Sequence, residues 1–418
     1  MTTDVRDAPA APGTGVFRGW WVVTGVFVML LVTAGLGFYG LPVYLRSLTV
    51  EQGFSVGAVS IATAVFFGVS GLSGLPVAAF MADRDPRPMI AVGATASAVS
   101  LLLLGRVQEV WQLYAVYALF GAGFAASSLV PGTTLVARWF ARRRSIALSV
   151  ASTGLSAGGV VVTPLVATLI DRHGLSTVTP YLAAALVVGV VPVTALLLRP
   201  SPQALGLLPD GDPAPPAGSP VAYGGALVAE ALRTRYFACL TAGHLLAMLA
   251  QVGGIAHLFN LVADRTDARF AATVGAVLAV SSLVGRLAGG WVAGRTSMRG
   301  LALTLMVGQA AALLLLAVSD SRTGLLLTTI GFGLTVGNLL MLHPLLLAER
   351  FGVRDYARIY SRSALLATAG IASGPAFIGV LRDAVDGYGI AFAVAAGASV
   401  LAAVVLSFSG PTRVPDPV

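Results

Sequence analysis

The chain has 418 residues, of which 56% are hydrophobic and only 11% charged, and its mean hydropathy is +0.86. Because soluble domains carry about 25% charged residues, this composition excludes a soluble enzyme, a secreted disulfide scaffold and a disordered chain. With 26 arginines, no lysine and 18 acidic residues, the net charge is +8. The arginines lie scattered in short polar segments, which excludes a groove that binds nucleic acid, and the single cysteine, Cys239, excludes a multi-cysteine metal site.

The first 18 residues are small or polar and contain no apolar stretch with a cleavage site, so we expect no removable signal peptide. Twelve apolar runs follow, each long enough for a helix of about 20 residues that crosses a bilayer. Strands are excluded because the runs lack a period of two and exceed about 11 residues. The runs lie at 19–45, 55–82, 88–105, 110–137, 144–170, 177–198, 233–262, 270–294, 300–318, 323–348, 358–382 and 388–409.

A proline-rich segment separates the sixth run from the seventh, and we expect it to be a flexible linker. The sequence therefore predicts an all-α membrane protein with twelve transmembrane helices in two pseudo-symmetric six-helix bundles. Its parts are a tail at 1–18, a first bundle at 19–198, the linker at 199–232, a second bundle at 233–409 and a tail at 410–418.

The arginines also predict the orientation. With the N-terminus in the cytoplasm, 17 arginines fall in cytoplasmic segments and 7 in external loops, and cytoplasmic loops of membrane proteins carry such an excess. Both tails and the linker are therefore expected in the cytoplasm. A composition without lysine and rich in alanine, glycine, valine and leucine is typical of GC-rich genomes, so we expect a multi-pass protein of a bacterial plasma membrane.

The two halves repeat each other. The fifth span carries Gly154-x-x-x-Gly158, and the eleventh carries Gly370-x-x-x-Gly374 at the equivalent place. Small residues at this spacing let two helix backbones approach closely. A repeat of six plus six spans, with a site between the halves, is typical of transporters.

The loop after the second span carries Ala79-x-x-x-Asp83-Arg84-x-x-Arg87. It resembles the Gly-x-x-x-Asp-Arg-x-Gly-Arg-Arg signature of the major facilitator superfamily, although alanine or proline replaces several of its residues. The eighth span ends in a second copy, in which glycine replaces the aspartate before Arg295. The resemblance implies the superfamily fold and a gate that involves Asp83, Arg84, Arg87 and Arg295.

Further stretches are similar to the monocarboxylate and oxalate–formate porter group within that superfamily. This resemblance implies a secondary transporter of small organic anions that works by alternating access. The stretches are GWWVV from Gly19, PGTTLVARWF from Pro131, RRRSIALSVASTGLSAGG from Arg142, Ala256-His257-Leu258, Gly285-Arg286-Leu287 and Gly374-Pro375.

Two arginines, Arg286 and Arg362, fall within predicted spans, whereas all 18 acidic residues fall in loops, tails or the last turn of a span. A charge at the middle of a bilayer costs at least about 2.5–3.5 kcal/mol, so it usually faces a wet cavity and has a function. With no embedded carboxylate, the substrate is expected to supply the anion, and the planar guanidinium suits a carboxylate. The alternatives are an Arg286 bonded to backbone carbonyls and an Arg362 that snorkels to the cytoplasm.

The remaining candidates are polar residues of other spans. The porter-group resemblance implies a cationic residue in span eight, sometimes with an acidic residue four positions earlier, which is Ser282 here. His257 is the candidate proton carrier because histidine has a reference pKa of about 6.5. Asn338 and Tyr117 are candidate hydrogen-bond donors to the substrate, although each of these side chains could instead hold helices together. His343, which precedes a proline, is interpreted as structural.

The sequence thus predicts a secondary transporter, and no enzyme, that carries a monocarboxylate through Arg286 and Arg362, with a proton moving through His257 in symport. Uniport or anion exchange would need no protonatable group. No cofactor or metal is expected, because phosphate-loop and metal-ligand spacings are absent from the sequence. We expect a monomer. The alternatives are an exporter of neutral or hydrophobic drugs or metabolites and, less favoured, a transporter-like sensor.

The predicted orientation can be tested with fused reporters. Because Arg142, Arg143 and Arg144 form the strongest positive segment, a reporter fused after Arg144 should be active in the cytoplasm, and one fused after Arg172 should be active outside. Reporter activity in intact cells measures both, and the reverse pattern would overturn the orientation.

Overall fold

The computed structural model describes residues 17–211, 224–385 and 387–410. Within these ranges the chain forms helices and connecting segments, and the only β-type pairing described there is an isolated bridge between Gly225 and Gly352. Twelve stretches are long and apolar enough to cross a membrane. The predicted all-α fold with twelve spans is therefore confirmed.

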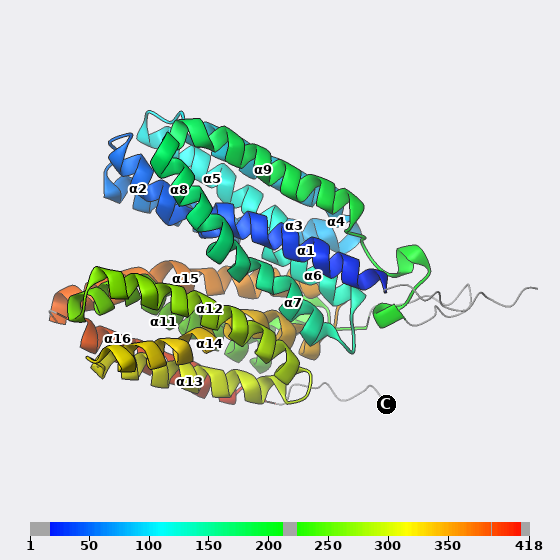
Figure 1. Ribbon diagram of the computed structural model, residues 1–418. Helices are drawn as coiled ribbons and strands as arrows, with labels where there is room; N and C mark the ends of the chain where they lie inside the picture. Colours follow the sequence, from blue (N-terminus) through cyan, green and yellow to red (C-terminus); the bar gives the residue numbers. More distant parts are fainter. Residues whose placement is uncertain (1–16, 212–223, 386, 411–418) are drawn as a thin grey trace, which may run out of the picture.

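The first six spans form one bundle and the last six a second, with the short helix α10 (Val228–Leu232) ahead of the second (Figure 1). The first bundle contains α1 (Arg18–Thr33), α2 (Leu41–Val50), α3 (Val56–Asp83), α4 (Pro86–Leu104), α5 (Val110–Ser127), α6 (Leu129–Trp139), α7 (Arg144–Ala157), α8 (Thr163–His173) and α9 (Leu175–Leu196). The second contains α11 (Arg235–Arg265), α12 (Ala268–Ala293), α13 (Met298–Val318), α14 (Arg322–Phe351), α15 (Tyr356–Val385) and α16 (Tyr388–Ser407).

The bundles lie side by side and diverge along their length (Figure 1). They come together where α6 and α7 lie, at the end of the molecule where α1 begins and α9 ends. We call this the linker end, and we call the opposite end, where α2 and α8 lie, the far end.

The first and fifth spans are each interrupted by a π-helix. Ala34–Phe38 connects α1 to α2, and Gly158–Val162 connects α7 to α8. The two π-helices pack against each other, because a Cβ atom on Gly35 would lie 2.9 Å from the carbonyl oxygen of Gly158. Such local widening of a helix is frequent at functional sites.

The repeated glycines determine how the spans pack within each bundle. A Cβ atom on Gly154 would overlap the carbonyl oxygen of Phe27, which brings α7 against α1. In the second bundle, a Cβ atom on Gly370 would overlap the carbonyl oxygen of Leu245, which brings α15 against α11. The close approach expected from the sequence repeat is therefore present in both halves.

The linker is attached to both bundles on either side of 212–223, which lie outside the described residues. Before that segment, the Asp210 carboxylate accepts hydrogen bonds from the backbone N–H groups of Ala141 (3.0 Å) and Arg142 (2.7 Å) in the loop between α6 and α7. After it, the Val228 N–H donates to the Asp355 carboxylate (3.0 Å) in the loop between α14 and α15. These two loops occupy equivalent places in the two halves.

Because α7 packs tightly against α1, a side chain at position 154 should strongly lower the thermal stability of the protein. Gly154→Val should lower the thermal unfolding temperature in detergent, because an overpacked core costs about 1–3 kcal/mol. Gly68→Val is the matched control, since no atom lies within 4 Å of a Cβ atom at Gly68. Equal unfolding temperatures for the two variants would contradict this packing.

Candidate functional site

The bundles meet mainly through two pairs of helices, α12 with α7 and α3 with α15. In one pair, Gly290 of α12 packs against Ser149 of α7, and a Cβ atom on Gly294 would lie 3.0 Å from the Ser145 hydroxyl. In the other, a Cβ atom on Gly71 of α3 would lie 2.9 Å from Leu365 of α15. In each pair, a glycine of one bundle therefore lets a side chain of the other bundle pack against the helix backbone.

Arg286 lies between the bundles at this contact. It stands one helical turn before Gly290 and therefore on the same face of α12. Its Nη1 donates to the Ser152 carbonyl of α7, and the Ser149 hydroxyl donates to the carbonyl of Arg286 at 2.5 Å. Only 2% of the residue is exposed. Seven residues separate it from the end of α12, which corresponds to about 10 Å of helix.

The charge of Arg286 is not balanced by a carboxylate among the described side chains. No acidic residue of that set forms an ion pair with it, and its Nε is buried without a hydrogen-bond partner. A guanidinium has five N–H donors. Because an uncompensated buried charge is costly, the geometry leaves Arg286 able to bind an anion.

Tyr39 is a neighbour of Arg286 that the sequence prediction missed. Its hydroxyl lies within electrostatic range of the guanidinium. The π-helix Ala34–Phe38 ends just before it, and a Cβ atom on Gly159 would lie 3.1 Å from its ring. The glycine clusters at 35–37 and 158–159 were the available signal, but a glycine pattern does not identify the side chain it exposes.

Asn338 and Ser282, two of the candidate substrate-binding residues, lie close to Arg286. Ser282 is buried one turn before Arg286 on α12. On α14, a Cβ atom on Gly337 would lie 3.1 Å from the Cβ of Arg286. The adjacent Asn338 donates to the carbonyls of Gly285 (2.7 Å) and Leu334 (2.8 Å), while its Oδ1 is buried without a partner.

His257 lies at a different depth from Arg286. It stands eight residues, or about 12 Å, before the far end of α11. Its Nε2 lies 2.9 Å from the Pro375 carbonyl and its Nδ1 lies 3.4 Å from the Tyr388 hydroxyl. Because a carbonyl only accepts, Nε2 is the protonated nitrogen and Nδ1 is free to accept from the tyrosine.

Arg362 and Tyr117 also lie apart from Arg286. The Nη1 of Arg362 donates to the Arg358 carbonyl at 2.9 Å, one turn nearer the linker end, and the residue is half-buried. The Tyr117 hydroxyl is buried without a hydrogen-bond partner. Neither side chain contacts Arg286 in the described part of the chain.

The residues proposed for the gate lie at the linker ends of α3, α4 and α12. The Asp83 side chain is not among those the structure describes. Arg84 lies over the ring of Phe80, 5.1 Å from its centroid, and Arg295 lies over the ring of Trp291 at 3.9 Å.

Arg87 is held by a carboxylate that the sequence analysis did not single out. Its guanidinium Nη2 donates to the Asp85 carboxylate at 2.7 Å. Partial burial raises the pKa of Asp85, but the Arg87 hydrogen bonds and the nearby charges of Arg87 and Arg138 outweigh it and lower the pKa. The pairing therefore stabilises the fold above the ordinary pKa of aspartate, and this contribution is lost as the pH falls through the lowered pKa.

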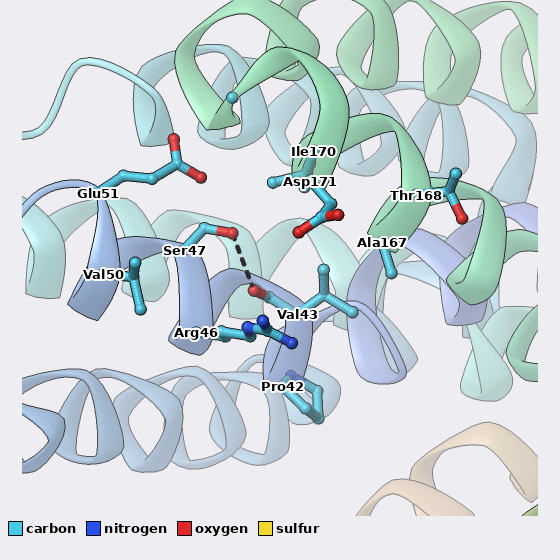
Figure 2. Close-up of a pocket in the computed structure, with 11 residues that line it drawn as sticks. Pro42, Val43, Arg46, Ser47, Val50, Glu51, Ala167, Thr168, Ile170 and Asp171 are labelled. Atoms are coloured by element: carbon cyan, nitrogen blue, oxygen red, sulfur yellow. Dashed lines mark hydrogen bonds between the residues drawn. The ribbon is translucent and has the colours of Figure 1, made fainter. Parts of the chain in front are cut away.

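The first bundle is hollowed at the far end. A cavity of about 840 Å³ lies between α2 and α8, and Figure 2 shows Arg46, Glu51 and Asp171 around it. In the described structure none of these three forms an ion pair. At the linker end, a small apolar space bordered by Thr133, Ser152 and Pro344 lies between the described parts of the two bundles. The structure is thus closed at the linker end.

Among the described residues, no group of three or more His, Cys, Asp or Glu could hold a metal.

Comparison with known proteins places these observations in a family. The sequence pattern of the Major Facilitator Superfamily matches residues 25–347. The chain is 29% identical to Monocarboxylate transporter 13 of Bos taurus over 95% of this chain and 92% of that protein. It is 27% identical to the Fujikurins efflux protein of Gibberella fujikuroi over 30% of this chain and 27% of that protein. The fold is similar to the crystal structure of FucP, a transporter in the outward conformation, with a TM-score of 0.72 at 15% identity, over 95% of this chain and 99% of that chain.

The contact between α12 and α7 predicts that a wedge will open the linker end. Gly290→Leu should force the bundles apart there, because its side chain would occupy the place of Ser149. A cysteine at Ser152 in a Cys239→Ser background should then react faster with a maleimide added from the linker side. Gly275→Leu on the same helix is the control, since no atom lies within 4 Å of a Cβ atom there. Unchanged labelling in Gly290→Leu would contradict the closed contact.

Proposed function

The chain belongs to the Major Facilitator Superfamily, and we propose that it moves a small organic anion, a monocarboxylate, across the membrane by alternating access. Members of this superfamily are transporters, and the chain is a multi-pass membrane protein with twelve spans and not an enzyme. The name of its mammalian relative, a monocarboxylate transporter, supports this substrate class.

The observation that carries the proposal is the unpaired guanidinium of Arg286. It lies between the two bundles, almost fully buried, with no carboxylate partner among the described residues and with an unbonded Nε. A substrate carboxylate would supply the missing charge and accept two parallel N–H bonds. Because Arg286 also bonds to Ser152 of the other bundle, substrate binding there would act directly on the contact that closes the linker end.

The surrounding residues take supporting roles in this proposal. Three neighbours would orient the substrate next to Arg286. Tyr39 lies within electrostatic range of the guanidinium, Ser282 lies one turn earlier on the same helix, and Asn338 bonds to the carbonyl of Gly285. Arg362 and Tyr117 would contribute only after a rearrangement, since neither contacts Arg286 in this conformation. His257 would carry a proton in symport, because its Nδ1 is open to protonation.

Gating is proposed to occur at the linker end, with Asp83, Arg84, Arg87 and Arg295 holding the loops in place. On the arginine distribution, the linker end faces the cytoplasm of a bacterial cell. The far-end cavity beside Arg46 and Asp171 would then be the route by which external substrate enters.

The rival function is export of neutral or hydrophobic compounds. Its support is the similarity to a fungal efflux protein over 30% of this chain. An exporter of neutral compounds would need no cationic substrate site, so the role of Arg286 separates the two functions.

We therefore expect Arg286→Gln to lose carboxylate binding while keeping the fold. Loss of a desolvated charged hydrogen bond costs about 2–5 kcal/mol, which corresponds to a roughly 30-fold to several-thousand-fold weaker affinity. Arg286→Lys should recover only part of the affinity, because an ammonium cannot form the bidentate pair. Thermal-shift titration of purified protein with a panel of short carboxylates, sugars and hydrophobic drugs measures these affinities.

Arg106→Gln is the matched control, because Arg106 is exposed in a loop. This variant should bind carboxylates as tightly as wild type does. Elution profiles in size-exclusion chromatography show that each variant is folded. If Arg286→Gln binds carboxylates as tightly as wild type, or if wild type binds only neutral compounds, the organic-anion function is wrong and the exporter function takes its place.

A further inference from the structure

Two histidines from distant parts of the sequence are stacked in the interior of the second bundle. The rings of His244 on α11 and His343 on α14 are 3.9 Å apart, centroid to centroid, and their planes differ by 17°. Only 3% of each residue is exposed. The proposed function assigns no role to either ring.

The pair sits in a small polar network. The Nε2 of His343 lies 2.7 Å from the Ser363 hydroxyl of α15, which lies 2.7 Å from the Thr241 hydroxyl of α11. The Tyr360 ring lies edge-on to His343 at 5.6 Å. Tyr360 is the other titratable group that faces the pair, and among the described side chains no carboxylate or arginine contacts either imidazole.

We infer that the His244–His343 pair binds a single proton and that this proton opens the linker end of the transporter. Two neutral imidazoles can stack as observed, and one of them can take up a proton, whereas two imidazolium ions at 3.9 Å would repel each other strongly. The inference rests on the proposed function, to which it adds a second proton site that acts on the linker end and is separate from the one proposed at His257.

A chain of contacts leads from the pair to the other bundle. Tyr360 stacks on Tyr356, with ring centroids 5.7 Å apart. The Tyr356 hydroxyl is buried beside Thr133 and within electrostatic reach of Arg144, both of which belong to the first bundle. The Tyr356 hydroxyl therefore lies at the interface that closes the linker end.

Protonation of the histidine pair should open the linker end, and not close it, because the pair has no countercharge. A proton on the pair creates a buried cation with no carboxylate beside it among the described residues, and such a charge is stabilised by water. Separation of the bundles at the linker end would bring water towards the turn of α14 that follows His343, because Pro344 borders the small space between the bundles. Protonation should therefore favour the conformation that is open at the linker end.

The test measures conformation without any substrate. Spin labels on Pro88→Cys and Arg354→Cys, both exposed at the linker end, report the separation of the bundles in a Cys239→Ser background. Double electron–electron resonance of protein in lipid nanodiscs should give longer distances at pH 5 than at pH 8. His343→Gln and His244→Gln should each abolish this shift, and His343→Phe, which keeps a ring in the stack, should do the same.

Two other histidines provide controls. His173→Gln, at an exposed far-end position, and His257→Gln should both keep the pH-dependent shift. The inference is overturned if wild type shows no shift, if the variants of the pair keep it, or if His257→Gln alone removes it. These outcomes can be told apart from failure of the proposed function, which would appear as an absence of carboxylate binding in wild type.

Discussion

The contact of α12 with α7 depends on the absence of side chains. Because Gly290 and Gly294 offer no Cβ atom, the serines of α7 can reach the backbone of α12, and the two bundles meet at the linker end. The same approach encloses Arg286 between them, with a backbone carbonyl as its described hydrogen-bond partner. The closed linker end and the unpaired cation are therefore two results of one packing arrangement, so a ligand that binds the cation would act on the contact that closes this end.

Much of the fold could be predicted from the sequence because the relevant signals are local. The spans can be predicted from continuous apolar runs, and the close helix contacts can be predicted from the spacing of glycines such as Gly154 and Gly370. Arg286 was recognisable because an arginine within an apolar run is rare and costly. These features need no knowledge of which helices become neighbours.

The rest of the site depends on tertiary packing. Tyr39 approaches Arg286 only because two π-helices from separate spans pack against each other, and no pattern in the sequence predicts a π-helix. The stacking of His343 on His244 was not predictable from the sequence, because the two residues are 99 positions apart along the chain. Whether Arg362 faces the substrate depends on the rotation of one helix, and its hydrogen bond towards the linker end is the arrangement expected for a snorkelling side chain.

The attachments of the linker also affect how the protein could be re-engineered. Asp210 satisfies backbone N–H groups of the loop that begins α7, and Asp355 satisfies one at the start of α10. A flexible spacer of equal length would preserve the connection between the bundles but would leave the N–H groups of Ala141 and Arg142 without their acceptor. In this protein the connecting segment is consequently a structural part of each half. Exchanging it for a generic linker would remove hydrogen bonds from both bundles.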